Sequence, residues 1–550
     1  MATGYAFPEP VAVLGSPLLD DEVAADVRVV APLATLNRHG LVAGATGTGK
    51  TKTLQILAGE LSRAGVSSFI ADMKGDVTGI AAAGDPSNPK VQERAAQLAW
   101  TYQPSGHPVE FLSLSGKLGS PVRATVHSFG AVLLGKVMDL NETQTAVLSL
   151  IFKYCDDNQL PLLDLADLRT TLKYLSSDEG APALADYGGM STATVGVLLR
   201  SIVTLEESGA DVFFGEPEFD VLDLIRLMPD GQGVVSVLEL SDVVDKPRLF
   251  STFMLWMLAQ LYHVLPEVGD LPKPKLCFFF DEAHLLFNDA SKALMEQVEL
   301  TVRLIRSKGV GVFFATQAPT DVPSSVLAQL GNRVQHALRA FTPDDADNLR
   351  KAARTFPTSA FYDVETVITS LGIGEALVTV LSPRGIPSPL AATRLVPPDS
   401  SMAALDPAAF QAAIATGSLR AKYGTPLDRQ SAHEIITARI QAAQAAAAQA
   451  AAAQAAAAGV PAGAGGGGAP GAMTPAQYQR EIKRQAAEME RERRAAERDQ
   501  RAATREAQVE RRARERQQQQ VLRTGTKILT SRVGQDIIRG VFGTLFGGKR

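Results

Sequence analysis

Short apolar runs recur through the first 400 residues of the chain, and polar residues or glycines follow each of them. Clear cases are residues 41–43, 276–280 and 309–315. Such runs are typical of strands that are buried on both faces of a parallel sheet. The other predicted strands are residues 70–72, 233–240, 332–338 and 375–381.

The stretches between these strands place apolar residues three and four positions apart, which predicts helices. Three of the helices fall within residues 139–230 and predict an inserted helical subdomain, where Asn141 and Gln144 fit a capping box. Strands that alternate with helices predict an α/β fold with a doubly wound, mostly parallel sheet. The predicted helices are residues 51–64, 142–155, 163–175, 192–205, 249–265 and one that begins at Pro343.

The loop between the first strand and the first helix has the pattern G-x-x-x-x-G-K-T. Its glycines let backbone N–H groups close around a β-phosphate, and the helix points its positive end at the anion. Lys50 supplies positive charge to the β- and γ-phosphates, and the Thr51 hydroxyl is placed for Mg²⁺. The pattern predicts an ATP site; the alternative is a glycine-rich turn without a ligand. The nucleotide-binding residues are Gly44, Ala45, Thr46, Gly47, Thr48, Gly49, Lys50 and Thr51.

Two later strands end in residues suited to hydrolysis. Asp281 and Glu282 follow residues 276–280, and we expect Asp281 to hold Mg²⁺ through water while Glu282 polarises the attacking water. The alternative is that this pair only caps the next helix. Gln317 follows residues 309–315 and is placed to touch the γ-phosphate or the attacking water, unless it is an ordinary loop glutamine.

The residues around these motifs resemble the HerA/FtsK superfamily of ring-forming ATPases, and within it the bacterial HerA-like (helicase HerA-like C-terminal domain) proteins. The resemblance covers about residues 20–400. It implies a P-loop NTPase (RecA-like) core in a ring of six subunits, with nucleotide at each interface. The segments that carry it are NRHGLVA at 37–43, IADMKGD at 70–76, DLNETQ at 139–144, FDEAH at 280–284 and RSKGVG at 306–311.

The resemblance also implies that an arginine from the neighbouring subunit completes each site. Arg303, Arg306, Arg333 and Arg339 are the candidates, and we favour Arg306 and Arg333 as catalytic residues. The alternative for each is a surface or helix-end charge.

The second-strand motif of the resemblance contributes Asp72, Lys74 and Asp76, which we expect to line the nucleotide site or to contact its neighbour. A polar strand exit is the alternative. Superfamily members that work with a nuclease usually carry an N-terminal β-barrel. About forty residues precede the phosphate loop here, so we do not expect docking to a nuclease in that manner.

Composition points to a soluble, cytoplasmic protein. The two cysteines, Cys155 and Cys277, cannot form a disulfide framework, and the first residues lack the pattern of a signal peptide. Residues 471–550 hold 19 Lys and Arg against 10 Asp and Glu, a net charge of +9, whereas residues 1–470 hold 35 against 49, a net charge of −14. An acidic motor weakens a simple nucleic-acid interpretation, although a ring can gather its cations in a central channel.

These patterns predict an Mg²⁺-dependent ATPase, most simply a ring-forming DNA translocase or helicase-like motor and a homo-hexamer that acts on double-stranded DNA. The alternative is an ATP-driven assembly or switch that acts on protein partners or at a membrane surface through residues 521–550, where a cationic amphipathic helix is predicted. The predicted domains are a short N-terminal segment (1–38), the ATPase core (39–400), an Ala/Gln-rich helical extension (401–458), a Gly-rich linker (459–473), an Arg/Glu-rich helix or disordered segment (474–520) and the cationic helix (521–550).

Overall fold

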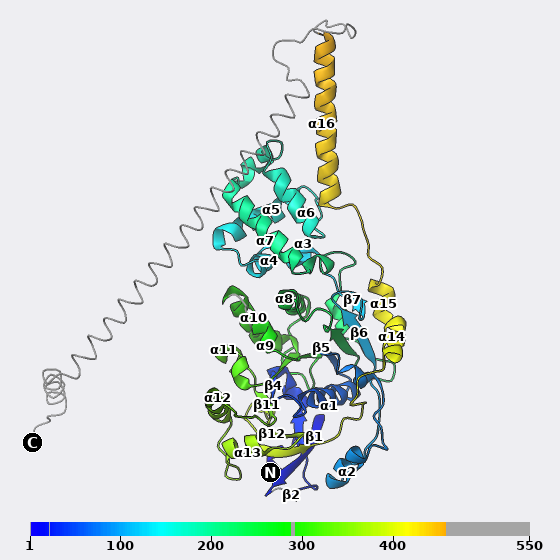
Figure 1. Ribbon diagram of the computed structural model, residues 1–550, viewed down its shortest axis with the longest axis vertical. Helices are drawn as coiled ribbons and strands as arrows, with labels where there is room; N and C mark the ends of the chain where they lie inside the picture. Colours follow the sequence, from blue (N-terminus) through cyan, green and yellow to red (C-terminus); the bar gives the residue numbers. More distant parts are fainter. Residues whose placement is uncertain (1, 21, 288–291, 458–550) are drawn as a thin grey trace, which may run out of the picture. The chain divides into compact units, whose positions relative to one another are not determined.

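The computed structural model of the chain describes residues 2–20, 22–287 and 292–457 (Figure 1). The chain divides into two compact units, Met1–Ala448 and Gln449–Arg550. Nearly all described residues belong to the first unit. The predicted linker, the Arg/Glu-rich segment and the cationic helix at 459–550 lie outside the described residues.

A single 13-stranded sheet organises the first unit. From β11 to β7 every neighbouring pair of strands is parallel, whereas β12, β13 and β1 join one edge in antiparallel fashion. The predicted α/β fold with a mostly parallel sheet is therefore confirmed. The strands, in sheet order, are β2 (Glu22–Val23), β1 (Val11–Leu19), β13 (Ala391–Leu395), β12 (Glu375–Thr379), β11 (Asn332–Gln335), β4 (Gly40–Ala43), β10 (Val310–Thr316), β9 (Leu276–Phe280), β5 (Ser67–Asp72), β8 (Val235–Glu239), β6 (Val109–Ser113) and β7 (Ser120–Pro121), with β3 (Val29–Pro32) paired to β1.

The sequence analysis predicted no strand before residue 40, yet β1 and β3 belong to the main sheet. Gly15 of β1 lies opposite Leu395 of β13, and β3 pairs with the other edge of β1. Buried side chains such as Ala12 and Leu14 add to the core. The N-terminal segment thus extends the main sheet.

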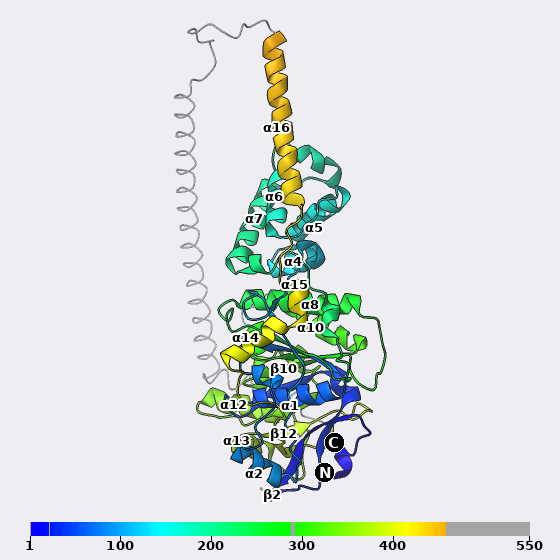
Figure 2. The ribbon, with the colours of Figure 1, turned by 90° about the vertical axis from the view of Figure 1, so that its right-hand side faces the viewer.

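Alternate residues of the central strands pack into two separate hydrophobic cores, one on each face of the sheet. Leu41, Phe278 and Phe280 pack on the face covered by α8 and α10, whereas Val42 and Phe279 pack on the face covered by α1 (Figure 2). Both faces of each strand are therefore buried, which explains the uninterrupted apolar runs in the sequence. The covering helices are α1 (Lys50–Arg63), α8 (Pro247–Val264) and α10 (Lys292–Ile305), and α12 (Pro343–Ala353) and α13 (Val364–Ser370) cover β12 and β13.

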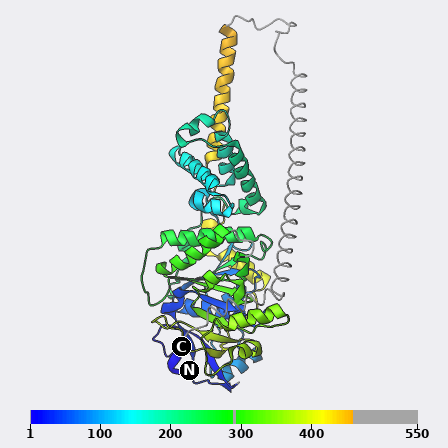
Figure 3. The ribbon, with the colours of Figure 1, turned by 90° about the vertical axis from the view of Figure 1, so that its left-hand side faces the viewer.

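The predicted helices of the insertion are present. They lie on the same side of the sheet as α8 and α10 (Figure 3) and share a continuous apolar core with α8. The side chain of Asn141 accepts a hydrogen bond from the backbone N–H of Gln144, and the Gln144 side chain accepts one from the Asn141 N–H, which confirms the predicted capping box. The three predicted helices are α5 (Glu142–Asp157), α6 (Leu165–Leu175) and α7 (Thr192–Glu207), and α4 (Ala131–Val137), which was not predicted, precedes them.

The segment after residue 400 returns to the sheet before its last helix begins. Helices α14 (Pro407–Thr416) and α15 (Ser418–Tyr423) follow the edge near β6, where the buried carboxylate of Glu110 accepts hydrogen bonds from Ser418 and Leu419. Helix α16 (Ala432–Ala457) contains the Ala/Gln-rich run. Within the described ranges, no helix is long and apolar enough to cross a membrane.

Candidate active site

The phosphate loop lies at the carboxyl edge of the sheet, between β4 and α1. The Gly44 N–H donates to the carbonyl of Thr316 at 3.1 Å, and the Ala45 N–H donates to the carbonyl of Ala337 at 2.8 Å. The Gly374 N–H, just before β12, donates to the carbonyl of Thr48 at 3.0 Å. Contacts with three neighbouring segments of the sheet thus fix the conformation of the loop.

Two glycines of the loop are required by geometry. Gly49 precedes α1 with φ of 118°, a left-handed conformation that other residues rarely adopt. A side chain on Gly44 would bring its Cβ within 2.4 Å of the Cβ of His336. The His336 ring contacts α1 as well, because its Nε2 lies 2.8 Å from the hydroxyl of Thr53.

Lys50 folds back over the loop that it follows. Its Nζ donates to the carbonyl of Gly44 at 2.7 Å, and it lies 3.4 Å from the carbonyl of Ala45. The residue is only 7% exposed, and burial lowers the pKa of its ammonium group against the opposing effect of Glu282 and Asp281. The ammonium group therefore occupies the mouth of the loop, where the sequence predicted contact with phosphate.

Three carboxylates converge beside Thr51 at the tips of β5 and β9. Oxygen atoms of Asp72, Asp76 and Asp281 all lie within 4.8 Å of one another, and the Thr51 hydroxyl donates to Asp76 Oδ2 at 3.3 Å. Asp76 Oδ1 and Asp281 Oδ2 are buried with no hydrogen-bond partner in the described part of the chain. Oxygen ligands in a compact group with free lone pairs fit Mg²⁺. Of the two predicted metal ligands, Asp281 lies in this group with Asp72 and Asp76, and Thr51 contacts the group through Asp76; their binding of Mg²⁺ stays a prediction.

The electrostatics of this group favour a cation. Burial, reinforced by the carboxylates of Glu282, Asp72 and Asp76, raises the pKa of Asp281 to about 7. Burial also raises the pKa of Asp72, although three backbone N–H groups oppose the effect. A divalent cation among these oxygens would neutralise the repulsion that raises the pKa values.

Glu239, at the tip of β8, extends the acidic edge and was missed by the sequence analysis. It is 2% exposed, and burial together with Asp72 and Asp242 raises its pKa to about 9. Its Oε1 has no hydrogen-bond partner among the described residues. The signal in the sequence was the same as for Asp281, because Glu239 ends an apolar strand that lies beside β5.

Glu282 has an unusual backbone conformation for a residue with a side chain. Its φ is 49°, in the left-handed region that side chains disfavour, and such conformations are concentrated at functional sites. The carboxylate is 7% exposed and forms an ion pair with Lys74. Burial acts to raise the pKa of Glu282, but the hydrogen bond and charge of Lys74 and the charge of Lys50 hold it below its usual value. Glu282 is therefore ionised and able to accept a proton.

Gln317 is exposed and follows β10 directly. Since β10 lies between β4 and β9, Gln317 follows the strand that separates the phosphate loop from Asp281 and Glu282. The turn after it is held by Asp321, which accepts hydrogen bonds from the Thr316 hydroxyl and the Ala318 N–H. Gln317 therefore lies at the carboxyl edge of the sheet. Its contact with nucleotide stays a prediction.

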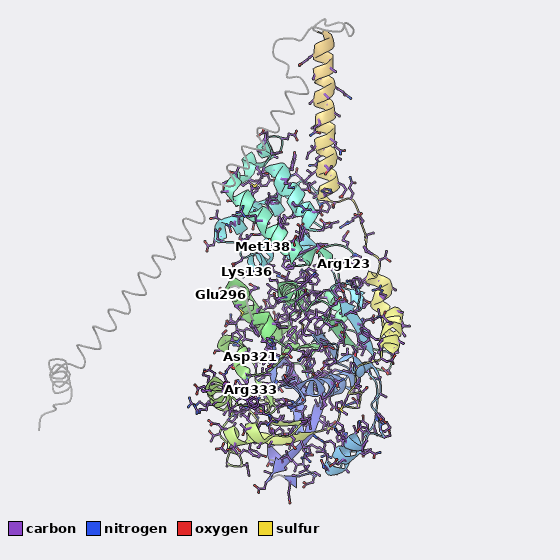
Figure 4. The ribbon with its side chains drawn as sticks, viewed as in Figure 1. Arg123, Lys136, Met138, Glu296, Asp321 and Arg333 are labelled. Carbon is purple, nitrogen blue, oxygen red and sulfur yellow. The ribbon has the colours of Figure 1, made fainter. Side chains whose placement is uncertain are left out.

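The two favoured arginines lie apart from the phosphate loop of their own subunit. Arg306 is exposed and precedes β10, so it lies at the amino edge of the sheet, beside a hollow of about 330 Å³ that Arg303 also lines. Arg333 lies within β11, and its guanidinium donates to the carbonyls of Leu330, Thr355 and Leu327 (Figure 4, where Arg333 and Asp321 are labelled). Arg339 is exposed and donates to the carbonyl of Thr369. Their action on a neighbouring site stays a prediction.

A hollow of about 190 Å³ next to the start of α1 was not anticipated from the sequence. Gly49, Lys52 and Ile56 form one wall, and Ile373 and Pro397 form another. Arg94 of α2 (Pro89–Gln97) reaches in and donates to the carbonyls of Gly374 and Ile373. Apolar walls with nearby cations suit a nucleobase attached to a phosphate chain. Its residues come from segments far apart in the chain, so no local pattern identifies the hollow.

A protein-family model matches most of the chain. The sequence of residues 18–550 matches the family described as Helicase HerA-like C-terminal. No curated protein matches the chain.

Several solved structures are similar at low identity. The bacterial conjugative coupling protein TrwBdeltaN70 in its unbound form has 15% identity and a TM-score of 0.46, over 74% of this chain and 93% of that one. The plasmid coupling protein TrwB in complex with ADP and Mg²⁺ has 15% identity and a TM-score of 0.45, over 70% and 95%. VirB4 of Thermoanaerobacter pseudethanolicus has 13% identity and a TM-score of 0.44, over 70% and 97%.

The family match extends over nearly the whole chain and agrees with the phosphate loop, the acidic strand tips and the parallel sheet. The chain therefore belongs to the Helicase HerA-like C-terminal family and is a P-loop ATP hydrolase.

Proposed function

We propose that the protein hydrolyses ATP with Mg²⁺ at the carboxyl edge of the sheet and uses the energy to move DNA through a ring of identical subunits. The observation that carries the proposal is the convergence at one edge of Lys50, Thr51, Asp76, Asp281 and Glu282. These groups supply what phosphoryl transfer to water requires: phosphate binding, metal ligands and a base.

Each group has a distinct task in this reaction. The loop N–H groups and Lys50 bind the β- and γ-phosphates, and the start of α1 adds its positive end. Thr51, Asp76 and Asp281 would hold Mg²⁺, which neutralises charge on the phosphates. Glu282 accepts a proton from the attacking water, for which its ionised state is required.

The hollow beside Gly49 favours a nucleotide, rather than a phosphate without a base, as the ligand of this site. It begins where α1 begins, so a base attached to phosphates in the loop can reach its apolar wall. Lys52 lines it, and burial lowers the pKa of that ammonium group while Asp76 and Asp72 oppose the effect. We expect the purine to lie between Ile56 and Ile373.

The ring and the DNA substrate rest on family membership. Arg306 cannot reach its own phosphate loop from the opposite edge of the sheet, which is compatible with action on a neighbouring site. The test is the rate of phosphate release with and without double-stranded DNA, over a salt series, with Lys50→Ala as the inactive control. Stimulation that fades as salt rises supports a DNA motor.

The same assay separates the alternative function. A switch that acts on proteins or membranes through residues 521–550 would hydrolyse ATP without responding to DNA. A version of the chain that ends at residue 457 retains the contacts that Ser431 and Ile436 make within the first unit and removes the basic tail. If double-stranded DNA still stimulates ATP hydrolysis by this truncated chain, DNA binding belongs to residues 1–457.

A further inference from the structure

The ion pair between Lys74 and Glu282 is built from a rigid turn on one side and a strained residue on the other. The carboxylate of Asp72 accepts hydrogen bonds from the N–H groups of Lys74 at 3.0 Å, Gly75 at 2.8 Å and Val77 at 2.8 Å. This turn fixes the backbone from which the Lys74 side chain extends. Glu282, on the other side, holds its left-handed conformation at the tip of β9.

The two partners differ sharply in exposure. The Lys74 side chain is 48% exposed, whereas the Glu282 side chain is 7% exposed. Lys74 has a long, flexible chain that can change partners at little cost, but Glu282 cannot move far. Lys74 binds Glu282 Oε1, whereas Oε2 accepts no hydrogen bond from the described residues and lies 3.4 Å from His284 Nδ1, so Lys74 occupies only one of the two oxygens that a water must approach.

Lys74 and Lys50, the residue expected to bind the γ-phosphate, share Glu282 as a neighbour. The charges of Lys74 and Lys50 both act on this carboxylate. A γ-phosphate bound by Lys50 brings several negative oxygens to that region. A phosphate with more than one full charge competes strongly with a single carboxylate for a lysine.

We propose that Lys74 is a positioning residue that pairs with Glu282 in the absence of nucleotide and transfers to the γ-phosphate when ATP binds, which frees Glu282 to act as the base. This inference rests on the proposed hydrolysis of ATP at the same site. It makes Lys74 a sensor of the γ-phosphate, because ADP lacks the group that draws it away. The base is then available only when there is a phosphate to transfer.

The test measures the affinity of a non-hydrolysable ATP analogue and of ADP, by calorimetry, for the full-length chain. The decisive comparison is Glu282→Gln against the double variant Lys74→Met with Glu282→Gln, since neither retains the carboxylate that could repel the analogue. We expect the double variant to bind the analogue at least ten-fold more weakly, about 1.4 kcal/mol, while ADP affinity changes less than two-fold. Lys74→Arg in the Glu282→Gln background should restore analogue binding.

The controls separate this role from simpler ones. Lys117→Met removes an exposed lysine outside the site and should change neither affinity. Equal analogue affinity in the two Glu282→Gln backgrounds would overturn the proposal, because Lys74 would then only neutralise the carboxylate. Equal loss of ADP and analogue binding would also overturn it and would mark Lys74 as structural. If folded Glu282→Gln bound neither nucleotide, the proposed function itself would fail, and this inference with it.

Discussion

The replacement Asp76→Asn tests whether the acidic group at the tips of β5 and β9 holds Mg²⁺. Asp76 has about the same shape as asparagine but carries a charge, and one of its oxygens already accepts from the Thr51 hydroxyl. Its other oxygen is buried without a partner in the described ranges. The replacement therefore keeps the packing and removes one carboxylate from the group of three acidic side chains whose oxygens lie within 4.8 Å of one another.

The size of the effect follows from Coulomb's law. A full charge about 4 Å from a divalent cation contributes about 2 kcal/mol even at the dielectric constant of water. That energy predicts that Asp76→Asn binds Mg²⁺ about 30-fold more weakly than the unaltered chain. In the absence of metal, ADP should bind to Asp76→Asn at least as well as to the unaltered chain, because the replacement removes an anion that repels the phosphates.

The assay measures the affinity for Mg²⁺ by calorimetric titration in the presence of ADP. The titration is repeated with Mn²⁺, whose binding is detected by electron paramagnetic resonance. Asp242→Asn is the matched control, because Asp242 is an exposed carboxylate near the same edge that accepts from Ser115 and stands outside the three-carboxylate group. If Asp281→Asn weakened Mg²⁺ binding but Asp76→Asn left it within three-fold of the unaltered chain, Asp76 would have no place among the metal ligands.

Three further predictions concern the base, the acidic edge and the neighbouring subunit. Glu282→Gln should bind ATP but hydrolyse it roughly 10²–10⁴ times more slowly, as single-turnover kinetics would measure; an unchanged rate contradicts the role of Glu282. Glu239→Gln should flatten the pH dependence of stability. The folded pKa of Glu239, about 9, exceeds the ordinary 4.5, so the unaltered chain loses stability as pH rises between these values. At pH 8 the variant should therefore have a free energy of unfolding larger by more than about 1.4 kcal/mol, seen as a higher denaturation midpoint. The same denaturation midpoint for both proteins at pH 5 and at pH 8 would be evidence against this. Mixing Arg306→Ala subunits with Lys50→Ala subunits, each inactive alone, should restore hydrolysis if Arg306 acts on a neighbouring site, and a mixture without activity would count against it.

Much of the fold could be predicted because the central strands are buried on both faces. An uninterrupted run such as Phe278-Phe279-Phe280 has few other environments in a globular domain, and polar residues after such a run mark the carboxyl edge. The order of strands in the sheet places Asp281 and Thr51 at the same edge. The phosphate loop was visible for a different reason, because its chemistry requires particular residues at fixed spacing.

The remaining features depend on contacts between distant parts of the chain. The hydrogen bond from Thr51 to Asp76 and the ion pair of Lys74 with Glu282 join residues 25 and 208 positions apart, so no local pattern contains them. The three backbone carbonyls around the guanidinium of Arg333 are likewise visible only in the fold, and its action on a neighbouring site stays a prediction. Sequence patterns identify groups that can do chemistry, whereas the fold decides which of them are free to do it.

The most direct test of the central claim is the steady-state release of phosphate from ATP by the full-length chain, with and without Mg²⁺, beside the Lys50→Ala variant. We expect turnover that requires Mg²⁺ and that Lys50→Ala abolishes, because Lys50 lies at the mouth of the phosphate loop, where its Nζ donates to the carbonyl of Gly44. Hydrolysis by folded Lys50→Ala at the rate of the unaltered chain would contradict the account.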